Sequence, residues 1–322
     1  LARRPGYALV ASGTLALGLA ASTAAFTYVS AYGRPFPGVG VDRLHQVWLA
    51  TDDAPWGALS LPDYEDLATL DGAPFSVTAA GASFFLASVR HPELTEVAEG
   101  EAVAGGFFSL LGVDVSLGRG LSPQDDRPAA APVAVISHDY WASRYGADPA
   151  VAGRTILLNN EAYTIVGVVG PGFRGSSAAS RPQFWIPFEQ YMRVYRPGEA
   201  SRIDREAGGF VPIIRLAEGM TAAAAEDALA AFASRLDRDA PLAGRRRTFA
   251  LEAATWIRPG TREAEAVTTR VLVAAAAFLL LLACANVANL VLSAGARRHR
   301  EIAIRRTLGA SRGNLVGQLL LE

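Results

Sequence analysis

Residues 271–296 read VLVAAAAFLLLLACANVANLVLSAGA and carry no charged side chain. About 20 apolar residues in a helix suffice to cross the ~30 Å hydrocarbon core of a bilayer. Inside the bilayer the backbone must satisfy its own hydrogen bonds, which a helix does. A core helix of a soluble protein seldom runs this long without a polar face. The sequence therefore predicts a transmembrane helix at 271–296.

A second uncharged stretch, residues 7–33, contains the run ALVASGTLALGLAASTAAF and predicts a first transmembrane helix. Arg3 and Arg4 before an apolar run are also typical of a secretory signal peptide, with small residues at 20–24 as a cleavage site. The apolar run exceeds the ~7–15 residues of such peptides, which favours the membrane helix. Because the chain begins with Leu1, we expect that it is a fragment whose true start is missing.

The charges outside these two stretches indicate an orientation. Residues 1–6 and 297–322 together hold eight Arg and two Glu, a net charge of +6, whereas residues 34–270 hold 22 Arg and 29 acidic residues, a net charge of −7. Arginine-rich flanks of membrane helices stay in the cytoplasm, while a long loop is translocated largely regardless of its charge. We therefore expect both ends of the chain in the cytoplasm and residues 34–270 outside it.

Residues 34–270 combine patterns of strands and helices. Ser60, followed by a proline and an acid, is typical of a helix N-cap, and Thr221 precedes an amphipathic helix. Asn159 and Asn160 suit a hairpin turn because they tolerate positive φ. Strands are predicted at 44–50, 155–158, 162–169, 210–216 and 249–257, and residues 133–141 are predicted to be a strand running into a turn.

Gly- and Pro-rich stretches divide the insert into two parts. The first part is predicted to be discontinuous, at about 41–110 and 185–262, and the second to be inserted at about 125–184. The fold class expected from these patterns is an α+β extracytoplasmic domain, residues 34–270, between two transmembrane α-helices.

Composition excludes much enzyme chemistry. The chain has no Lys, which rules out a P-loop and a Schiff-base lysine. Its single Cys rules out an internal disulfide and a thiolate zinc cluster, and the four His show no metal-ligand spacing. We therefore expect that the chain is not an enzyme, that it holds no metal or cofactor, and that nucleic acid is not its partner.

Three local clusters are interpreted as structural. Asp125 and Asp126 lack the spaced oxygen ligands of a calcium loop and suit a turn and a helix cap. His138 and Asp139 resemble an acid–base pair, but neighbours on a strand point to opposite faces. The aromatic residues expected to pack in the core are Tyr140, Trp141 and Tyr145.

The two predicted membrane helices carry residues suited to helix packing. Small residues every four positions let another helix approach closely, and polar amides in hydrocarbon need protein partners. The small residues of the first helix are Ser12, Ala16, Ala20 and Ala24, and the polar residues on one face of the second are Asn286, Asn289 and Ser293. We expect both rows to contact other helices, and a substrate-contacting role for the polar row is the alternative.

Residues 297–322 follow the second membrane helix and are basic and amphipathic. Ile302 and Leu308, with arginines between them, predict a short helix for which Gly309 suits the C-cap. Such a segment either lies on anionic headgroups or docks into the groove of a partner protein. The residues alone favour neither.

Several runs of this chain resemble MacB/FtsX-type ABC transporter permeases. Residues 280–322, with REIAIRRTLGAS at 300–311 as the most specific part, resemble the second membrane helix of these proteins and the segment after it. Residues 3–26 are similar to the first helix. Within the insert, GGFFSLLGVDVSLGRGLSPQDD at 105–126 and the run 132–169 resemble the MacB-type periplasmic core domain. Within this family, the chain most resembles the group of permeases with duplicated halves.

The resemblance implies a periplasmic domain with a porter-like α+β part and an inserted β-rich part. It also implies that 297–322 is a coupling segment, the truncated start of an FtsX-like permease domain, which meets a separate ATP-binding subunit. The residues that it places at the ATPase interface are Glu301, Ile302, Arg305, Arg306, Leu308 and Gly309. ATP is bound by the partner on this reading. The family has four membrane helices per unit, so the chain is expected to be a fragment.

The expected function is that of a permease subunit in the bacterial inner membrane, which transmits ATP-driven conformational change from a cytoplasmic ATPase to a periplasmic domain for export. The expected partners are that ATPase, a second permease copy or duplicated half, the lipid bilayer and a periplasmic adaptor. The alternative is a membrane-anchored receptor with a periplasmic sensing domain, which has the same helix–domain–helix topology.

Overall fold

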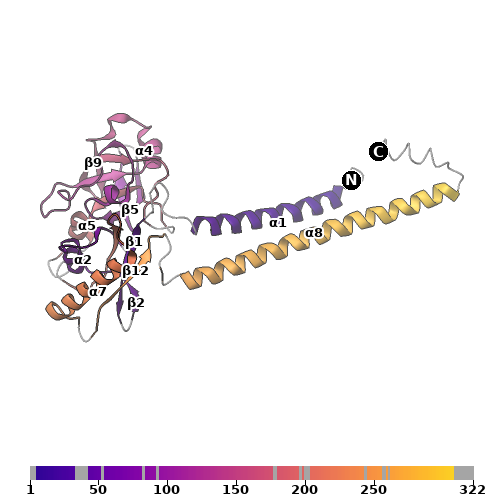
Figure 1. Ribbon diagram of the computed structural model, residues 1–322. Coiled ribbons are helices and arrows are strands. Elements are labelled where there is room, and N and C mark those ends of the chain that lie inside the picture. The colour runs from indigo at the N-terminus through magenta and orange to yellow at the C-terminus, as the bar shows by residue number, and fades with distance from the viewer. Residues whose placement is uncertain are drawn as a thin grey trace. The chain divides into compact units, whose positions relative to one another are not determined.

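The computed structural model describes residues 5–32, 43–51, 54–81, 84–91, 94–176, 180–195, 198, 204–242, 245–255, 259 and 262–307. The chain divides into a helical unit, Leu1–Ala31 with Glu263–Glu322, and a folded domain, Tyr32–Arg262. Figure 1 shows the elements of both units.

The described part of the domain builds one twelve-stranded sheet. Its strands are β1 (Leu44–Thr51), β2 (Ala54–Gly57), β3 (Phe75–Gly81), β4 (Phe85–Arg90), β5 (Thr95–Val103), β6 (Val115–Gly118), β7 (Val133–Ile136), β8 (Thr155–Leu158), β9 (Glu161–Val169), β10 (Phe184–Pro187), β11 (Phe210–Leu216) and β12 (Thr248–Ala253). Its helices are α2 (Leu61–Ala68), α3 (Phe107–Leu111), α4 (His138–Tyr145), α5 (Phe188–Tyr195) and α7 (Ala222–Asp239), with a 3₁₀ turn, η1, at Pro149–Val151.

Six of the strands close into a barrel. Their order is β5-β10-β7-β9-β8-β4, and hydrogen bonds between β4 and β5 complete the ring. The core inside it includes Val89, Ile156, Ile165 and Phe184, none of them more than 1% exposed. Closure leaves these strands without unpaired edges. The predicted insert at 125–184 therefore forms the barrel only together with β4 and β5, which the sequence analysis placed in the other part.

The remaining long strands form an open antiparallel sheet in the order β3-β11-β1-β12. Helices α2 and α7 lie against it at the end of the domain opposite to β9 and α4 (Figure 1) and bury Leu67, Leu229 and Phe232. Burial of each such side chain stabilises the fold by roughly 1.5–3 kcal/mol. The open sheet joins the barrel where Ala80 of β3 pairs with Val103 of β5.

The local signals in the sequence produce the predicted starts and turns. Ser60 Oγ accepts the N–H of the third residue of α2 at 3.2 Å, and Thr221 Oγ1 accepts an N–H of α7 at 3.3 Å. Asn159 and Asn160 connect β8 to β9 with φ of 50° and 68°, the left-handed pair that a two-residue hairpin requires. These predictions are confirmed.

The prediction of a strand running into a turn over 133–141 is correct for the strand and wrong for the turn. Strand β7 ends at Ile136, and Ser137 Oγ accepts the N–H of Tyr140 at 3.1 Å, so that a helix, α4, begins at His138. His138 and Asp139 lie in the first turn of that helix, 3.8 Å apart between Nδ1 and Oδ1, so the argument from strand alternation does not apply to them. A serine followed by an acid is an N-cap signal, and it outweighs the apolar run before it.

A buried ion-pair network fastens the elements around the open sheet. The side chains of Asp63 on α2 and Arg247 before β12 are fully buried, with Oδ2 and Nε 3.3 Å apart. Arg247 also contacts Asp237 at the end of α7, at 3.1 Å. Arg205 bridges Asp63 and Asp66 at 2.5 and 2.8 Å. Four separate segments are thus held by one set of charges, which pair because isolated buried charges are costly.

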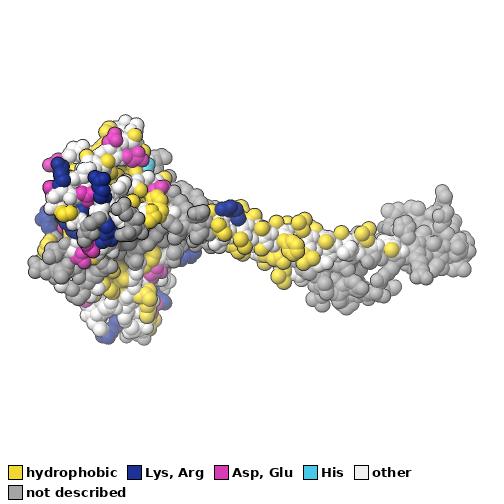
Figure 2. All heavy atoms as spheres, turned by 90° about the horizontal axis from the view of Figure 1, so that it is seen from below, with side chains coloured by type: hydrophobic (Ala, Val, Ile, Leu, Met, Phe, Trp, Pro, Cys, Tyr) yellow, Lys and Arg dark blue, Asp and Glu magenta, His cyan; other side chains and the backbone are white. Residues whose placement is uncertain are grey.

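The helical unit contains one continuous helix, α8 (Arg262–Thr307), of 46 residues. It encloses the predicted span at 271–296, and its segment Ala266–Asn289 is long and apolar enough to cross a membrane, with mean hydropathy 2.6. Figure 2 shows hydrophobic side chains along the described part of this helix. The backbone stays helical through Thr307, so the expected short helix in the tail is continuous with the span up to that residue.

Helix α1 (Pro5–Tyr32) contains 28 residues and covers most of the first predicted span at 7–33. Among its described side chains the apolar segment is Ala16–Thr27, which is shorter than a membrane crossing requires. In the described residues, α8 alone has a segment that passes the test for a span. The membrane crossing predicted at 7–33 therefore stays a prediction.

Candidate functional site

Helices α1 and α8 contact one another through small residues. A side chain added at Gly18 would lie 3.6 Å from the β-carbon of Ala283 and 3.7 Å from the carbonyl of Leu279. Ala25 on α1, with Ala276 and Ala283 on α8, is buried. Residues without bulky side chains allow this close approach, which is how helices associate in lipid.

The predicted packing rows are not the ones used in this contact. The side chains of Ser12, Ala16, Ala20 and Ala24 are all exposed. On α8, Asn286 is half-buried and Asn289 is exposed, while the side chain of Ser293 is outside the described set. A row of small residues does indicate a packing face, but α1 has more than one such row. Gly18 and Ala25, seven positions apart, form another row, and Gly18 is the residue that contacts α8. The expectation that the predicted rows meet other helices stays a prediction.

The predicted coupling residues lie at the end of α8 and beyond it. Glu301, Ile302, Arg305 and Arg306 belong to its last turns, and their side chains are outside the described set. Leu308 and Gly309 are outside the described residues altogether. The structure thus places four of the six on a helix that is continuous with the membrane-length segment.

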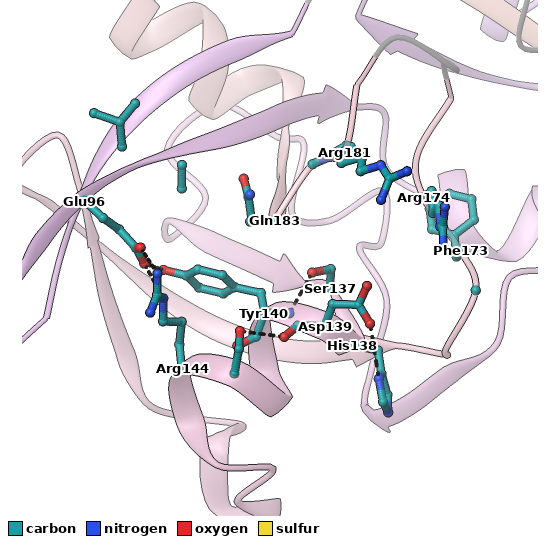
Figure 3. Close-up of a pocket in the computed structure, with 15 residues that line it drawn as sticks. Glu96, Ser137, His138, Asp139, Tyr140, Arg144, Phe173, Arg174, Arg181 and Gln183 are labelled. Atoms are coloured by element: carbon teal, nitrogen blue, oxygen red, sulfur yellow. Dashed lines mark hydrogen bonds and ion pairs between the residues drawn. The ribbon is translucent and has the colours of Figure 1, made fainter. Parts of the chain in front are cut away.

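A cavity of about 310 Å³ opens beside the barrel between β5, α4 and residues 172–174 and 181–183 of the loop that precedes β10 (Figure 3). Arg174 and Arg181 of that loop lie toward one end of it, and Glu96 with Arg144 toward the other. Tyr140, predicted to be a packing residue, does pack in the barrel core and also lines this cavity.

Glu96 is the centre of a hydrogen-bonded cluster at one end of the cavity. It accepts hydrogen bonds from Arg144 Nε at 2.9 Å and from the hydroxyl of Tyr140 at 3.1 Å, and its Oε1 lies 3.2 Å from His91 Nε2. Burial alone would raise its pKa, but the hydrogen bonds from Arg144, Tyr140 and His91 outweigh burial and lower the pKa of Glu96 below its ordinary value. Glu96 therefore stays ionised and holds Arg144 in place.

The described parts of this loop, residues 171–176 and 180–183, are anchored close to Arg174 and Arg181. Phe173 is buried against Trp185, with ring centroids 5.4 Å apart. Ser176 donates its backbone N–H and its hydroxyl to the carboxyl group of Glu101, which is fully buried and also accepts Trp185 Nε1–H at 2.7 Å. Gln183 donates its backbone N–H to the carbonyl of Glu99 at 2.8 Å. The backbone on which the arginines stand is therefore fixed to β5 and β10.

Glu101 should make the stability of the domain depend on pH. Burial raises its pKa to about 7, although hydrogen bonds from Ser176 and Trp185 oppose that shift. Between about pH 4.5 and 7 the folded state keeps this proton and the unfolded state loses it, so the free energy of unfolding falls as pH rises through this window and levels off above it. The full change is on the order of 3 kcal/mol.

The replacement Glu101→Gln is expected to remove that slope, since the amide has no proton to lose in this range. The free energy of unfolding by urea, measured from pH 5 to 8, checks this. Glu226→Gln, on the exposed face of α7, is the control and should keep the slope. A Glu101→Gln domain with the same slope as the wild type would show that Glu101 does not titrate in this window.

The acid pair Asp125–Asp126 is structural, as predicted. Asp125 forms a two-point ion pair with Arg119 at 2.6 and 2.8 Å. Asp126 accepts the N–H of Gly105 at 3.1 Å and that of Glu189, at the start of α5, at 2.9 Å. In the described parts of the chain no group of three or more His, Cys, Asp or Glu side chains could hold a metal ion.

The sequence analysis missed the cavity because its residues are far apart in the chain. Glu96 and Arg144 are 48 positions apart, and β5, which carries Glu96, was not predicted as a strand. The run TEVAEGEAV has no aromatic residue, and the acids and the glycine in its middle are disfavoured in strands. Its β-branched residues, Thr95, Val97 and Val103, were the available signal.

Residues 8–232 match the MacB-like periplasmic core domain, and residues 273–322 match the FtsX-like permease C-terminal domain. The chain belongs to the MacB-like permease family. The runs quoted at 105–126 and 132–169 lie inside the first match, and the run 280–322 lies inside the second, so the resemblance stated from the sequence is confirmed.

Curated relatives of this MacB-like chain are named as macrolide exporters. The "Macrolide export ATP-binding/permease protein MacB" of Burkholderia thailandensis is 24% identical over 277 residues, which are 84% of this chain and 40% of that protein. The protein of the same name in Escherichia coli K12 is 25% identical over 265 residues, 80% of this chain and 38% of that protein. The chain thus spans about two fifths of the length of these relatives.

Solved structures similar to this MacB-like chain include a periplasmic region and a domain of a permease protein. The periplasmic region of MacB from Actinobacillus actinomycetemcomitans is 16% identical with a TM-score of 0.49, and covers 67% of this chain and 91% of that one. A domain of a permease protein from Porphyromonas gingivalis is 17% identical with a TM-score of 0.47, and covers 68% of this chain and 92% of that one.

Proposed function

We propose that this chain is the membrane-domain part of a MacB-type ABC transporter, which transmits ATP-driven motion from a cytoplasmic ATPase to the periplasmic domain and thereby drives export. The observation that carries the proposal is the continuity of α8. One helix of 46 residues begins at the end of the folded domain and includes both a membrane-length segment and the first four predicted coupling residues. Such a helix can move as a rigid element between two states.

The proposal assigns sides and partners. The arginine-rich flanks of both helices favour a cytoplasmic location for 1–6 and 297–322, with the folded domain in the periplasm. ATP is bound and hydrolysed by the partner, and this chain performs no catalysis and holds no cofactor itself. The bilayer, a second permease copy or duplicated half, and a periplasmic adaptor complete the set of partners.

The match of residues 273–322 to the FtsX-like permease domain separates this proposal from the receptor alternative. A receptor needs its second helix to lead into a signalling domain, whereas a permease needs it to lead into a segment that binds an ATPase. The macrolide export of the named relatives is a property of those proteins. Macrolides are the first cargo to test on this chain's transporter.

The double replacement Ile302→Asp and Leu308→Asp tests the proposal. Two carboxylates in the apolar side of the coupling segment should prevent its docking, because burying an unpaired charge is costly. We expect loss of ATPase co-purification and of macrolide export, with unchanged membrane insertion. The control is Arg312→Gln, in the same segment but outside the predicted interface. Undiminished ATPase binding and transport in the double variant would refute the assigned role.

A further inference from the structure

We propose that the cavity between β5, α4 and residues 172–174 and 181–183 binds a small organic oxyanion, a carboxylate or a phosphate ester. This site is independent of the proposed transmission of ATP-driven motion. Its volume of about 310 Å³ lies at the lower end of the range for small-molecule pockets. A ligand of this size is one small molecule rather than a chain segment.

The charge in the cavity points to an anion. Its lining includes Arg144, Arg174 and Arg181 against the acids Glu96 and Asp139. Arg144 and Glu96 neutralise one another in a two-point ion pair. The other two arginines have no hydrogen bond or ion pair from their guanidinium groups to any described residue, and both side chains are exposed.

Among the acids that line the cavity, Asp139 is the one outside the Glu96–Arg144 pair. Its carboxylate is 95% exposed, with Oδ1 3.8 Å from His138 Nδ1. Glu99, whose Oε2 accepts the backbone N–H of Arg181, is next to the cavity but outside its lining. Among the lining side chains, two guanidinium groups thus remain against one solvated carboxylate, a surplus of one positive charge. Guanidinium groups bind carboxylates and phosphates through two parallel hydrogen bonds, which suits an oxyanion better than a halide.

The arginines stand on backbone that is already fixed. Arg174 follows the buried Phe173 and comes two positions before Ser176, whose backbone N–H donates a hydrogen bond to Glu101. The backbone N–H of Arg181 donates to Glu99 Oε2 at 3.2 Å. A fixed backbone reduces the entropy lost when a ligand is bound, because only the two side chains must be ordered. The backbone at Arg174 and Arg181 is therefore positioned before a ligand binds.

The rest of the lining supplies hydrogen-bond donors and apolar surface. Ser137 and the first turn of α4 line the cavity. Ser137 Oγ accepts the N–H of Tyr140, whereas the N–H groups before it in this turn have no acceptor inside the helix and attract negative charge. Phe173 and Val97 add apolar contacts, and Val97 is 69% exposed. A ligand with an anionic head and a short apolar body would satisfy both kinds of wall.

The test is isothermal titration calorimetry of the whole chain in a neutral detergent at low salt. The probes are inorganic phosphate, phenyl phosphate and phenylacetate. We expect saturable binding of one probe molecule per chain, tightest for a probe with a phenyl group, and weaker binding at high salt. Tighter binding of phenyl phosphate would identify the ligand as a phosphate ester, and tighter binding of phenylacetate would identify it as a carboxylate.

The double variant Arg174→Gln and Arg181→Gln keeps the length and polarity of both side chains. We expect the dissociation constant to rise by about tenfold or more, because at least one charge-assisted hydrogen bond to the ligand is lost. Arg246→Gln, an exposed arginine before β12 that lies outside the cavity, is the matched control and should bind like the wild type. Absence of saturable binding to the wild type, or equal affinity in the double variant, would overturn the proposal.

Discussion

Arg247→Ala is expected to lower the free energy of unfolding of the folded domain by about 3 kcal/mol. The guanidinium group is fully buried and contacts Asp63 on α2 and Asp237 on α7. Its removal leaves a buried carboxylate with only one of its two cationic partners, Arg205. Breaking a buried pair in this way costs about 3–5 kcal/mol, and the remaining partner places the expected loss at the lower end.

The neighbouring residue provides the control for this prediction. Arg246 is exposed and has the same charge and the same place before β12, so Arg246→Ala should change the free energy of unfolding by no more than about 0.5 kcal/mol. Urea titration of both variants, followed by tryptophan fluorescence, measures the two changes. Equal stabilities of the two variants would mean that the network around Arg247 does not hold the four segments together.

Ala296→Pro is expected to uncouple the transporter without removing it from the membrane. Proline inside a helix removes one backbone hydrogen bond and clashes with the preceding turn, at a cost of about 3 kcal/mol. That cost would reduce the population of unbroken α8 by about two orders of magnitude. Position 296 is the last residue of the predicted span 271–296 and comes before the coupling residues, so membrane insertion and ATPase binding should persist while export is lost.

Ala296→Leu is the matched control because leucine keeps the backbone N–H and favours the helix. The side chain of Ala296 is exposed in the helical unit, so the larger residue meets no described neighbour. Export by the transporter that contains this chain, measured together with co-purification of its ATPase, separates the outcomes. Wild-type export in the proline variant would show that continuity of α8 is not needed for transmission.

The predictable parts of this fold are those determined by local physics. Caps at Ser60 and Thr221, the Asn159–Asn160 turn and the uncharged run inside α8 each act over fewer than about eight residues or through simple hydropathy. Their energies do not depend on distant segments, so the sequence pattern alone predicts them.

The parts that escaped prediction depend on contacts between distant residues. The barrel closes through β4–β8 and β5–β10 pairs whose partners are about 70 to 85 positions apart, and no local pattern reports such pairing. The contact through Gly18 was missed because several rows of small residues on α1 are equally suitable, and only the partner helix decides among them. The cavity was not predicted because it depends on two features that the sequence pattern did not show. These are the place of β5 in the barrel and the helix α4 after β7.

The most direct test of the central claim measures on which side of the membrane the residues before and after α8 lie. Single cysteines are introduced at Arg246 in the folded domain and at Arg312 in the coupling segment, in a background where Cys284 is replaced by Ala. Intact spheroplasts are then treated with a membrane-impermeant maleimide. We predict labelling of Arg246→Cys in intact cells and of Arg312→Cys only after lysis. Labelling of both positions in intact cells, or of neither, would contradict a helix that links a periplasmic domain to a cytoplasmic ATPase.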